Sequence, residues 1–360
     1  MTKNSTLDKN ETKTKELKKF FVLVIGCQQN EHDGIRINHM LKKIGLTESN
    51  LEEADLVIVV ACSVRQTGVD RIFGTIKNWP DKTIVTTGCV LETDRNKFLD
   101  RGVKFWDIEK PNDLIEIINL KNNAGLDVLL EEGSVFSSSV PIMFGCNNFC
   151  SYCATPYTRG AERSVLKNKI VKEVKQLIDQ GKEEILLLGQ NVNSYKDPET
   201  GSDFEDLLRT LNALDGNFII AFTSNHPKDM SDGIIDAVAS LPKIKKEIHL
   251  PIQSGSDKIL KAMNRPYTKK QYLEIVKKIR KANPIIAITT DVIIGFPGES
   301  EEDFQETVEI FKTVKYKMAY INKYSPRAGT AAYKLGDPIP WKEKQRRWHE
   351  LDKVLSKTRF

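Results

Sequence analysis

The sequence predicts two consecutive α/β units, an N-terminal parallel sheet followed by a full or partial (β/α)6 barrel. Strand-like runs rich in β-branched residues alternate with helix-like stretches along most of the chain. A polar, Ser-rich stretch, EEGSVFSSSV at 131–140, interrupts this alternation, and the pattern then restarts. Alternating strands and helices are typical of right-handed βαβ units around parallel strands. We therefore expect two packed cores joined by a linker over residues 131–138.

The composition is that of an ordinary globular protein. Of 360 residues, 40% are hydrophobic and 29% charged, and this length predicts two domains. The net charge of +5 permits a nucleic-acid partner without requiring one. The longest apolar runs have strand length, so we expect no membrane span. Residues 1–18 lack the apolar core of a signal peptide, which predicts a disordered tail and a cytoplasmic protein.

The first unit contains three buried strands, and a cysteine follows each of them. The strands are FFVLVIG (20–26), ADLVIVVA (54–61) and KTIVTTG (82–88), with helices expected over 36–45 and 69–79. Cys27, Cys62 and Cys89 come just past the three strand ends. Parallel strands of a sheet present their carboxyl ends at one edge, where ligands bind. The sequence thus predicts one site made by three thiols; the alternative is three small buried side chains.

The second unit contains six predicted strands, and the first of them leads into a cysteine loop. The strands are VPIMFG (140–145), EEILLLG (183–189), NFIIAFT (217–223), KEIHLPI (246–252), IAITTDVIIG (286–295) and MAYINKY (318–324). Helices are expected between them, for example over 166–178 and around Phe304, Val308 and Phe311. Active sites of parallel barrels form at the carboxyl ends of the strands. The charged tail from Ala331 to Phe360 predicts a solvent-facing helix, with RNA contact as the alternative.

The loop FGCNNFCSYC presents three thiols at the spacing C-x3-C-x2-C, at Cys146, Cys150 and Cys153. Structural zinc is normally closed by four ligands, so three would need a distant fourth. A cubane iron–sulfur cluster held by three cysteines leaves one iron open to an exogenous ligand. Spacing alone leaves both interpretations standing.

This loop resembles the signature of the radical S-adenosylmethionine (SAM) enzymes, and further segments resemble their methylthiotransferase family. The matching segments are GCQQNEHD (26–33), ACSVRQ (61–66), GCV (88–90), FGCNNFCSYCATPYTRGAERS (144–164), LLLGQNVNSY (186–195), FTSNHP (222–227), HLPIQSGSD (249–257), DVIIGFPGES (291–300) and SPRAGT (325–330). They resemble most the branch that acts on tRNA carrying N6-dimethylallyladenosine next to the anticodon. The resemblance implies a methylthiotransferase α/β domain over 19–130 and a radical SAM partial (β/α)6 barrel with a helical tail over 139–360.

The resemblance also implies two [4Fe–4S] clusters. Cys146, Cys150 and Cys153 would hold the cluster that binds SAM on its open iron and yields a deoxyadenosyl radical. Cys27, Cys62 and Cys89 would hold a second cluster, which carries the sulfur to be inserted. SAM is then consumed twice, once to methylate that sulfur and once to abstract hydrogen from C2 of the adenine.

Other residues enter as SAM-site candidates, each with a structural alternative. Gly189, Gln190 and Asn191 end a strand where such enzymes bind the amino group of SAM, or they form a polar turn. Tyr152 either packs near the adenine or is a loop aromatic. Further candidates at strand ends or just after the cysteine loop are Thr223, Ser224, His226, Gln253, Ser254, Gly295, Gly298 and Glu299 for SAM, with Arg159 and Arg163 for tRNA phosphate.

The implied partners are tRNA with a modified adenosine, an electron donor such as flavodoxin or ferredoxin, and a sulfur donor. The family ends in a small β-rich RNA-binding domain of the TRAM type, which we expect to be missing from the residues after SPRAGT. Competing hypotheses are a relative acting on threonylcarbamoyladenosine tRNA or a ribosomal protein, a non-catalytic metal-containing RNA-binding module, and a radical enzyme that uses the first triplet only structurally.

Overall fold

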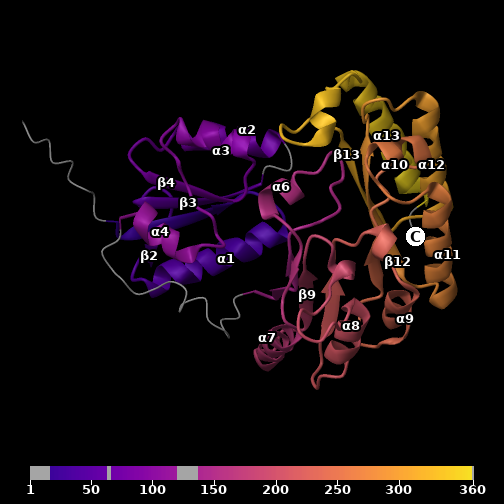
Figure 1. The fold of residues 1–360 in the computed structure, drawn as a ribbon, viewed down its shortest axis with the longest axis horizontal. Coiled ribbons are helices and arrows are strands. Elements are labelled where there is room, and N and C mark those ends of the chain that lie inside the picture. Colours follow the sequence, from indigo (N-terminus) through magenta and orange to yellow (C-terminus); the bar gives the residue numbers. More distant parts are fainter. Residues whose placement is uncertain (1–16, 63–65, 120–136, 359–360) are drawn as a thin grey trace, which may run out of the picture.

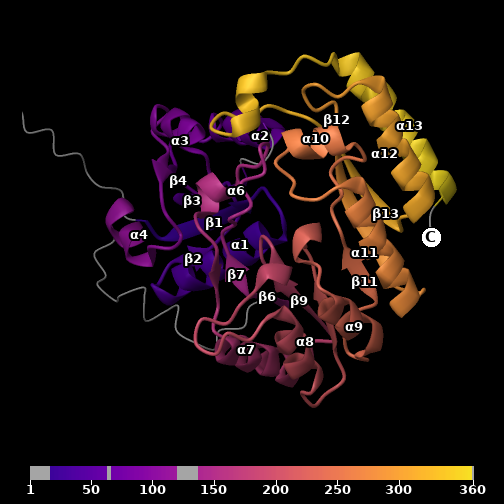
Figure 2. The ribbon, with the colours of Figure 1, turned by 45° about the vertical axis from the view of Figure 1, so that its right-hand side comes forward.

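The computed structural model describes residues 17–62, 66–119 and 137–358 (Figure 1). The expected disordered tail and linker fall largely on residues 1–16 and 131–136, which lie outside this range. Helices cover both faces of a sheet in the first half of the chain and surround a curved sheet in the second (Figures 1 and 2). No helix in the described part of the chain combines the length and apolar character needed to cross a bilayer.

Five parallel strands form the N-terminal sheet, in the order β2-β1-β3-β4-β5. Their bounds are β1 Lys19–Val24, β2 Thr47–Glu48, β3 Leu56–Cys62, β4 Thr83–Cys89 and β5 Lys104–Phe105. The three long strands confirm the prediction. The edge strands β2 and β5 were missed because two residues carry no periodic pattern.

Four helices cover the two faces of this sheet, and an apolar core lies between the sheet and the helices on each face. They are α1 Gln28–Lys43, α2 Gln66–Ile76, α3 Glu92–Leu99 and α4 Pro111–Ile117. Successive side chains of β3 alternate between the faces, as the pleat requires. Leu56, Ile58 and Val60 pack with residues of α1 and α4, whereas Val57 and Val59 pack with residues of α2 and α3. Such two-sided burial explains why the strand sequences are almost continuously hydrophobic.

Six parallel strands form the curved sheet of the second half, in two directly paired groups, β6-β9-β10 and β11-β12-β13. Their bounds are β6 Ser139–Pro141, β9 Glu184–Leu188, β10 Ile219–Phe222, β11 Glu247–His249, β12 Ala287–Ile294 and β13 Met318–Lys323. A parallel bridge between Ile220 and Ile244 joins the two groups. Among the described residues no pairing connects β13 back to β6, so the barrel is partial, as expected.

The predicted strand VPIMFG is broken, which corrects the sequence-based expectation. β6 pairs with β9 only as far as Pro141, and Met143–Phe144 forms a separate strand, β7. β7 pairs antiparallel with β8, Arg163–Ser164. This short ribbon closes the base of the cysteine loop, so the loop is held by its own two ends as well as by the barrel.

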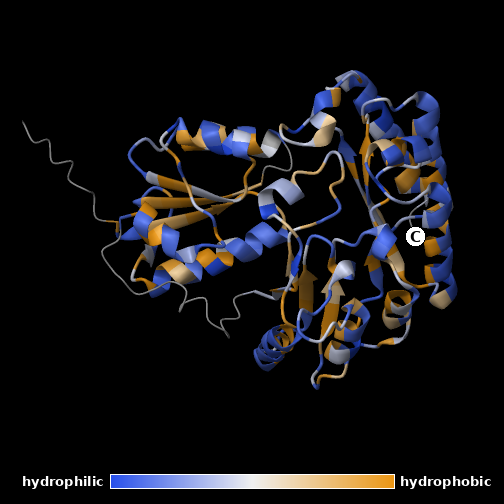
Figure 3. Cartoon of the chain, in the orientation of Figure 1, coloured by the Kyte–Doolittle hydropathy of each residue, from blue (hydrophilic) through white to orange (hydrophobic). Residues whose placement is uncertain are grey.

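Helices pack on the outside of the partial barrel around one large apolar core, and hydropathy colouring shows the apolar strands inside (Figure 3). The helices are α7 Lys167–Asp179, α8 Phe204–Asn212, α9 Asp232–Ser240, α10 Asp257–Ala262, α11 Lys269–Ala282, α12 Glu301–Val314 and α13 Trp341–Thr358, with 3-10 turns η1 Val192–Ser194, η2 Pro227–Asp229 and η3 Ala331–Leu335. The short helix α6 Thr155–Arg159 instead lies between the two units, against β4 (Figure 1). Capping boxes at Asp203, Thr268 and Ser300 begin α8, α11 and α12.

The tail helix α13 is not simply solvent-facing, which corrects the expectation for residues 331–360. Leu351 and Leu355 are buried in the barrel core. Lys344 donates a hydrogen bond to the carbonyl oxygen of Tyr324 at 2.9 Å. Arg347 pairs with the buried carboxylate of Glu299 at 2.7 Å. The high charge of the segment hid this contact, because two of its cations lie on the buried face.

We predict that Leu351→Ala lowers the free energy of unfolding by about 2–5 kcal/mol, because a fully buried leucine leaves a cavity. Lys353→Ala, on the exposed face of α13, should change it by less than about 0.5 kcal/mol. Thermal and urea unfolding of both variants measures the difference. Equal stability of the two variants would restore the solvent-facing interpretation.

Candidate active site

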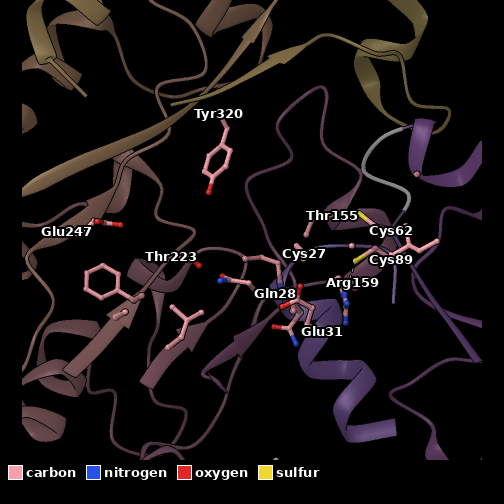
Figure 4. Close-up of a pocket in the computed structure, with 18 of the residues that line it drawn as sticks. Cys27, Gln28, Glu31, Cys62, Cys89, Thr155, Arg159, Thr223, Glu247 and Tyr320 are labelled. Atoms are coloured by element: carbon pink, nitrogen blue, oxygen red, sulfur yellow. Dashed lines mark hydrogen bonds between the residues drawn. The ribbon is translucent and has the colours of Figure 1, made fainter. Parts of the chain in front are cut away.

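The N-terminal cysteines gather at the carboxyl edge of the first sheet, as predicted. Cys27 occupies the N-cap position of α1, three residues after the end of β1. Cys62 and Cys89 are the last residues of β3 and β4 and are direct partners in the parallel register. The strand ends therefore bring together three thiols that are separated by up to 62 positions in the sequence. Figure 4 shows them around the head of one cavity.

Asn30 and two glycines fix the backbone around these thiols. The Asn30 side-chain nitrogen donates to the Ala61 carbonyl at 2.8 Å, and its oxygen accepts from the Cys27 thiol at 3.3 Å. A Cβ at Gly26 would lie 2.5 Å from the Asn30 side chain. Gly88 has φ +91°, and a Cβ there would lie 2.7 Å from the Ala61 oxygen. These positions explain the Gly-Cys pairs in the first and third motifs.

Arg159 reaches from α6 of the barrel unit into the N-terminal site. Its Nε donates to the Cys89 sulfur at 3.0 Å, and its Nη2 pairs with Asp33 at 2.6 Å. The two side chains of this ion pair are only 6% and 2% exposed. The expectation that Arg159 contacts tRNA phosphate is therefore wrong, because its guanidinium is buried and engaged. Arg163, in contrast, is exposed and only loosely paired with Glu109, at 3.4 Å.

The second cysteine loop is pinned to the barrel beyond its own ribbon. The Ser151 amide and hydroxyl donate to the Met263 and Ala262 carbonyls at 3.0 and 2.8 Å. The Ser151 carbonyl accepts from the Ala332 amide of η3 at 2.7 Å. Gly145 has φ +75°, and a Cβ there would collide with the Ala161 carbonyl. The loop thus has a fixed path before any ligand binds.

Each sulfur of this loop receives an N–H donor. The Asn148 side chain donates to Cys146, an Arg265 guanidinium nitrogen to Cys150 and the Thr155 amide to Cys153, each at 3.4 Å. N–H groups directed at sulfur favour a thiolate over a thiol and set the potential of bound iron–sulfur clusters. The donor set therefore fits a thiolate-bound cluster.

All six cysteines are outside disulfide bonds. Burial raises the pKa of the Cys153 thiol to about 11 and also raises the pKa of Cys89 and Cys146. Metal binding must therefore displace protons from these groups. In the described part of the chain no three His, Cys, Asp or Glu side chains converge on a single ion.

A cavity of about 840 Å³ connects the N-terminal thiols with the barrel. Its head holds Cys27, Cys62 and Cys89, and Thr155, adjacent to the second loop, also lines it. Gln28 and Glu31 of α1 add to the wall, and its other side comes from barrel strands, where Thr223, Glu247 and Tyr320 point inward (Figure 4). The N-terminal cysteines and Thr155, two positions after Cys153, therefore line one cavity, which the sequence alone did not establish.

Gln190, Asn191, Ser224 and Gln253 lie at successive strand ends of the barrel. Side-chain oxygens of Gln190, Asn191 and Gln253 are buried without a hydrogen-bond partner. Ser224 and Gln253 have φ of +63° and +67°, a left-handed conformation that is costly for residues other than glycine. Orphaned acceptors and strained backbone at one edge are typical of a ligand site. They suit a ligand with several N–H or O–H donors, such as the amino group and ribose of SAM.

Most of the remaining residues predicted to bind SAM pack against, or hydrogen-bond with, other residues of the protein. Gly189 lies against Met143, where a Cβ would come within 2.5 Å of its side chain. Tyr152 packs against the apolar cluster that contains Phe296 and Tyr324. Thr223 lines the cavity, and Ser254 is buried, where its hydroxyl accepts from the Ser256 amide at 3.2 Å.

His226 has a structural role through one of its two ring nitrogens. Its Nδ1 accepts from the Lys228 amide at 3.2 Å, which caps η2, while its Nε2 has no partner. Burial, with Arg265 and Lys228 nearby, lowers the pKa of His226 to about 2, so the imidazole is neutral. Because Nδ1 is the acceptor, the proton lies on Nε2, which can donate a hydrogen bond but supplies no charge.

The turn after β12 packs against α13, which fills most of the space around it. Glu299 accepts from the Gly295 amide at 2.6 Å and pairs with Arg347, both through Oε2, while its Oε1 is buried without a partner. Gly295 has φ +71°, and a Cβ there would meet Lys344. Gly298 has φ +86° and open space around it. Of Gly295, Gly298 and Glu299, only Gly298 leaves room for a ligand to approach the backbone.

Four site residues were missed by the sequence analysis. Arg265 donates to Cys150 and to Tyr267, and Tyr267 stands edge-on to the ring of His226. Asp229 accepts from Asn191 at 2.8 Å, and Asn225 has an orphaned oxygen. None of them has a spacing signal. Only the position of Asn225 beside Ser224 could have suggested it.

Comparisons with known proteins match both halves of the chain. Residues 140–311 match the profile described as the radical SAM superfamily, and residues 19–106 match that described as uncharacterized protein family UPF0004. A protein of Clostridium botulinum (strain Loch Maree) named tRNA-2-methylthio-N(6)-dimethylallyladenosine synthase is 40% identical, over 94% of this chain and 81% of its own length. Proteins of the same name from Carboxydothermus hydrogenoformans and Alkaliphilus oremlandii are 39% and 41% identical, over 93% and 94% of this chain and 82% and 78% of their own.

Solved structures share the fold at low sequence identity. The radical SAM methyltransferase TsrM from Kitasatospora setae matches with a TM-score of 0.64 and 13% identity, over 88% of this chain and 74% of its own. The cobalamin-dependent radical SAM enzyme OxsB matches with a TM-score of 0.57 and 13% identity, over 94% and 56%. Both support the arrangement of an α/β unit before a radical SAM barrel.

We predict that Gly88→Ala destabilises the protein by about 1–3 kcal/mol and weakens iron binding at the N-terminal thiols. The reason is that a Cβ at φ +91° would press on the Ala61 carbonyl and shift Cys89. Gly74→Ala, in α2 with open space around it, is the matched control and should bind iron like the wild type. Thermal unfolding and iron per chain measure both effects. A Gly88→Ala protein that matches the control in both would contradict the assigned role.

Proposed function

Because this chain belongs to the family of tRNA-2-methylthio-N(6)-dimethylallyladenosine synthases, we propose that it adds a methylthio group to C2 of that adenosine next to the anticodon in tRNA. It is a radical SAM methylthiotransferase, and radical SAM chemistry uses one [4Fe–4S] cluster and SAM. The observation that carries the proposal is the single cavity lined by three N-terminal cysteines, by Thr155 and by Gln190.

Cys146, Cys150 and Cys153 would hold the radical SAM cluster. When bound, the cluster and SAM supply the radical chemistry that activates C2 of the adenine. Asn148, Arg265 and the Thr155 amide stabilise the three thiolates. Gln190, Asn191 and Gln253 would accept hydrogen bonds from SAM through oxygens that otherwise have no partner. The contacts of Ser151 keep the loop in place, so little reorganisation accompanies binding.

We further propose that Cys27, Cys62 and Cys89 hold a second [4Fe–4S] cluster, which carries the sulfur to be transferred. Their common position at the head of the cavity supports this assignment. The N–H of Arg159 directed at the Cys89 sulfur supports it as well. A purely structural triplet would not need to line the same space as Gln190.

The barrel side of the cavity would receive the target adenosine. Its wall combines a planar ring at Tyr320 with apolar surface at Ala221 and Phe222. Such a wall suits a base that carries a hydrocarbon substituent, because the ring can stack and the apolar surface can cover the dimethylallyl group.

The remaining partners follow from the chemistry. Reductive cleavage of SAM requires an electron donor, and repeated turnover requires a sulfur donor. We propose a small electron carrier such as flavodoxin or ferredoxin for the first role, and the cytoplasm, where tRNA is found, as the place of reaction.

We predict that anaerobic reconstitution yields about eight iron atoms per chain, falling to about four when Cys146, Cys150 and Cys153 are all replaced by alanine. With a reductant and SAM, the wild type should form the methylthio nucleoside in tRNA that carries N6-dimethylallyladenosine. Metal analysis and mass spectrometry of digested tRNA measure both. About four iron atoms in the wild type and none in the variant would contradict the second cluster.

The same assay separates the competing functions. Tests of tRNA with threonylcarbamoyladenosine and of ribosomal protein compare the two related substrates, and a product from either one alone would replace the proposed substrate. Failure to cleave SAM would favour a non-catalytic binding module. A Cys62→Ala variant that retains SAM cleavage but loses sulfur insertion would exclude a structural role for the first triplet.

We predict that Arg163→Ala weakens tRNA binding and lowers the salt dependence of log Kd by about 0.7, the value for one phosphate contact. The exposed guanidinium of Arg163 is only loosely paired, so it is available to a phosphate. Arg163→Lys keeps the charge and should keep the salt dependence. Titrations at several salt concentrations measure the slope, and an unchanged slope in Arg163→Ala would remove this contact.

A further inference from the structure

Two arginines of the barrel unit, Arg159 and Arg327, form buried ion pairs with helices of the N-terminal unit. Arg159 pairs with Asp33 in α1, and Arg327 pairs with Asp94 in α3. Arg327 also donates to the Gln66 side chain at the first residue of α2. The helices α1, α2 and α3 are the ones that follow Cys27, Cys62 and Cys89. Each cysteine-bearing strand end is therefore tied to the barrel through the start of its helix.

The contacts are buried, which makes them strong constraints on geometry. Asp33, Asp94 and Arg327 are each 2% exposed. A buried ion pair gains little over an apolar contact, but loss of one partner leaves an uncompensated charge. The second oxygen of Asp33 is also engaged, since it accepts from Gln29 at 3.1 Å. The N-terminal unit therefore cannot shift relative to the barrel without exposing or orphaning these groups.

Arg159 differs from Arg327 in one respect. Its Nε points at the Cys89 sulfur at 3.0 Å, whereas the described contacts of Arg327 are with oxygen atoms. A positive charge and an N–H at a ligating sulfur stabilise the more negative, reduced state of a cluster. Arg159 comes from α6, which begins two residues after Cys153. The same short helix thus begins beside one cysteine site and contacts the other through its last residue.

We propose that Arg159 and Arg327 form an inter-unit clamp that fixes the N-terminal cysteine site against the barrel, and that Arg159 also sets the reduction potential of the group held there. Both are positioning residues. The clamp is independent of any cluster, whereas the effect on potential rests on the proposed function.

The first test uses the full chain without metal, under anaerobic reducing conditions, with peptide-resolved hydrogen exchange. Arg159→Gln should speed exchange in the first turns of α1 by about tenfold or more, and Arg327→Gln should do so in α2 and α3. Arg209→Gln, which removes an exposed arginine paired only within the barrel unit, is the matched control. Exchange in Arg159→Gln and Arg327→Gln equal to that in Arg209→Gln would overturn the clamp.

The second test measures the midpoint potential of the N-terminal cluster alone, in a chain with Cys146, Cys150 and Cys153 replaced by alanine. Adding Arg159→Gln should disfavour the reduced state by about tenfold, which is about 59 mV for one electron. Arg159→Lys, which keeps the charge, should lie between this value and the parent. Arg327→Gln should leave the potential unchanged, although it loosens the same interface.

The two tests fail separately. Equal potentials in Arg159→Gln and Arg327→Gln would overturn the tuning role, because a merely structural residue predicts that result. A chain that binds no iron at the N-terminal thiols would overturn the proposed function and the tuning role together. Hydrogen exchange of the metal-free chain would still decide the clamp.

Discussion

The parallel register between β3 and β4 is the constraint on which the N-terminal site depends. It sets Cys62 opposite Cys89, so two thiols arrive together because of backbone hydrogen bonding alone. The same pairing requires Gly88 at φ +91°, since any side chain would strike the Ala61 carbonyl of the neighbouring strand. Asn30 then ties the turn after β1 to that carbonyl and brings in Cys27. The site is thus a property of the sheet edge.

A comparable arrangement recurs in the barrel, although its backbone is different. Each cysteine site has one buried arginine directed at a sulfur, Arg159 at Cys89 and Arg265 at Cys150. Both guanidinium groups are buried away from bulk water, so each needs its carboxylate, carbonyl or sulfur partners to offset the cost of desolvation. A metal is bound by the thiolate form of cysteine, which places an anion beside each of these cations. Buried positive charge therefore favours the ligated state of both sites.

The sequence predicted local features well and distant contacts poorly. The long strands were found because β-branched runs are buried on both sheet faces, and Cys27, Cys62 and Cys89 were expected at one sheet edge because each follows a strand. Arg159 was misassigned because its partner Asp33 lies 126 positions earlier. Arg265 was missed because Cys150 is 115 positions away. The tail helix was misread because Lys344 and Arg347 find buried partners that no pattern of charges reveals.

The contact between α13 and the turn after β12 has a consequence for the order of events during synthesis. Glu299 is buried with a charge that is compensated by Arg347, 48 positions later. Lys344 likewise fills the space above Gly295. Until the ribosome has released residues 344–347, this turn holds an unpaired carboxylate and an unfilled gap. By the same reasoning Asp33 and Asp94 of the N-terminal unit wait for Arg159 and Arg327, and the barrel edge waits for the last helix of the described chain.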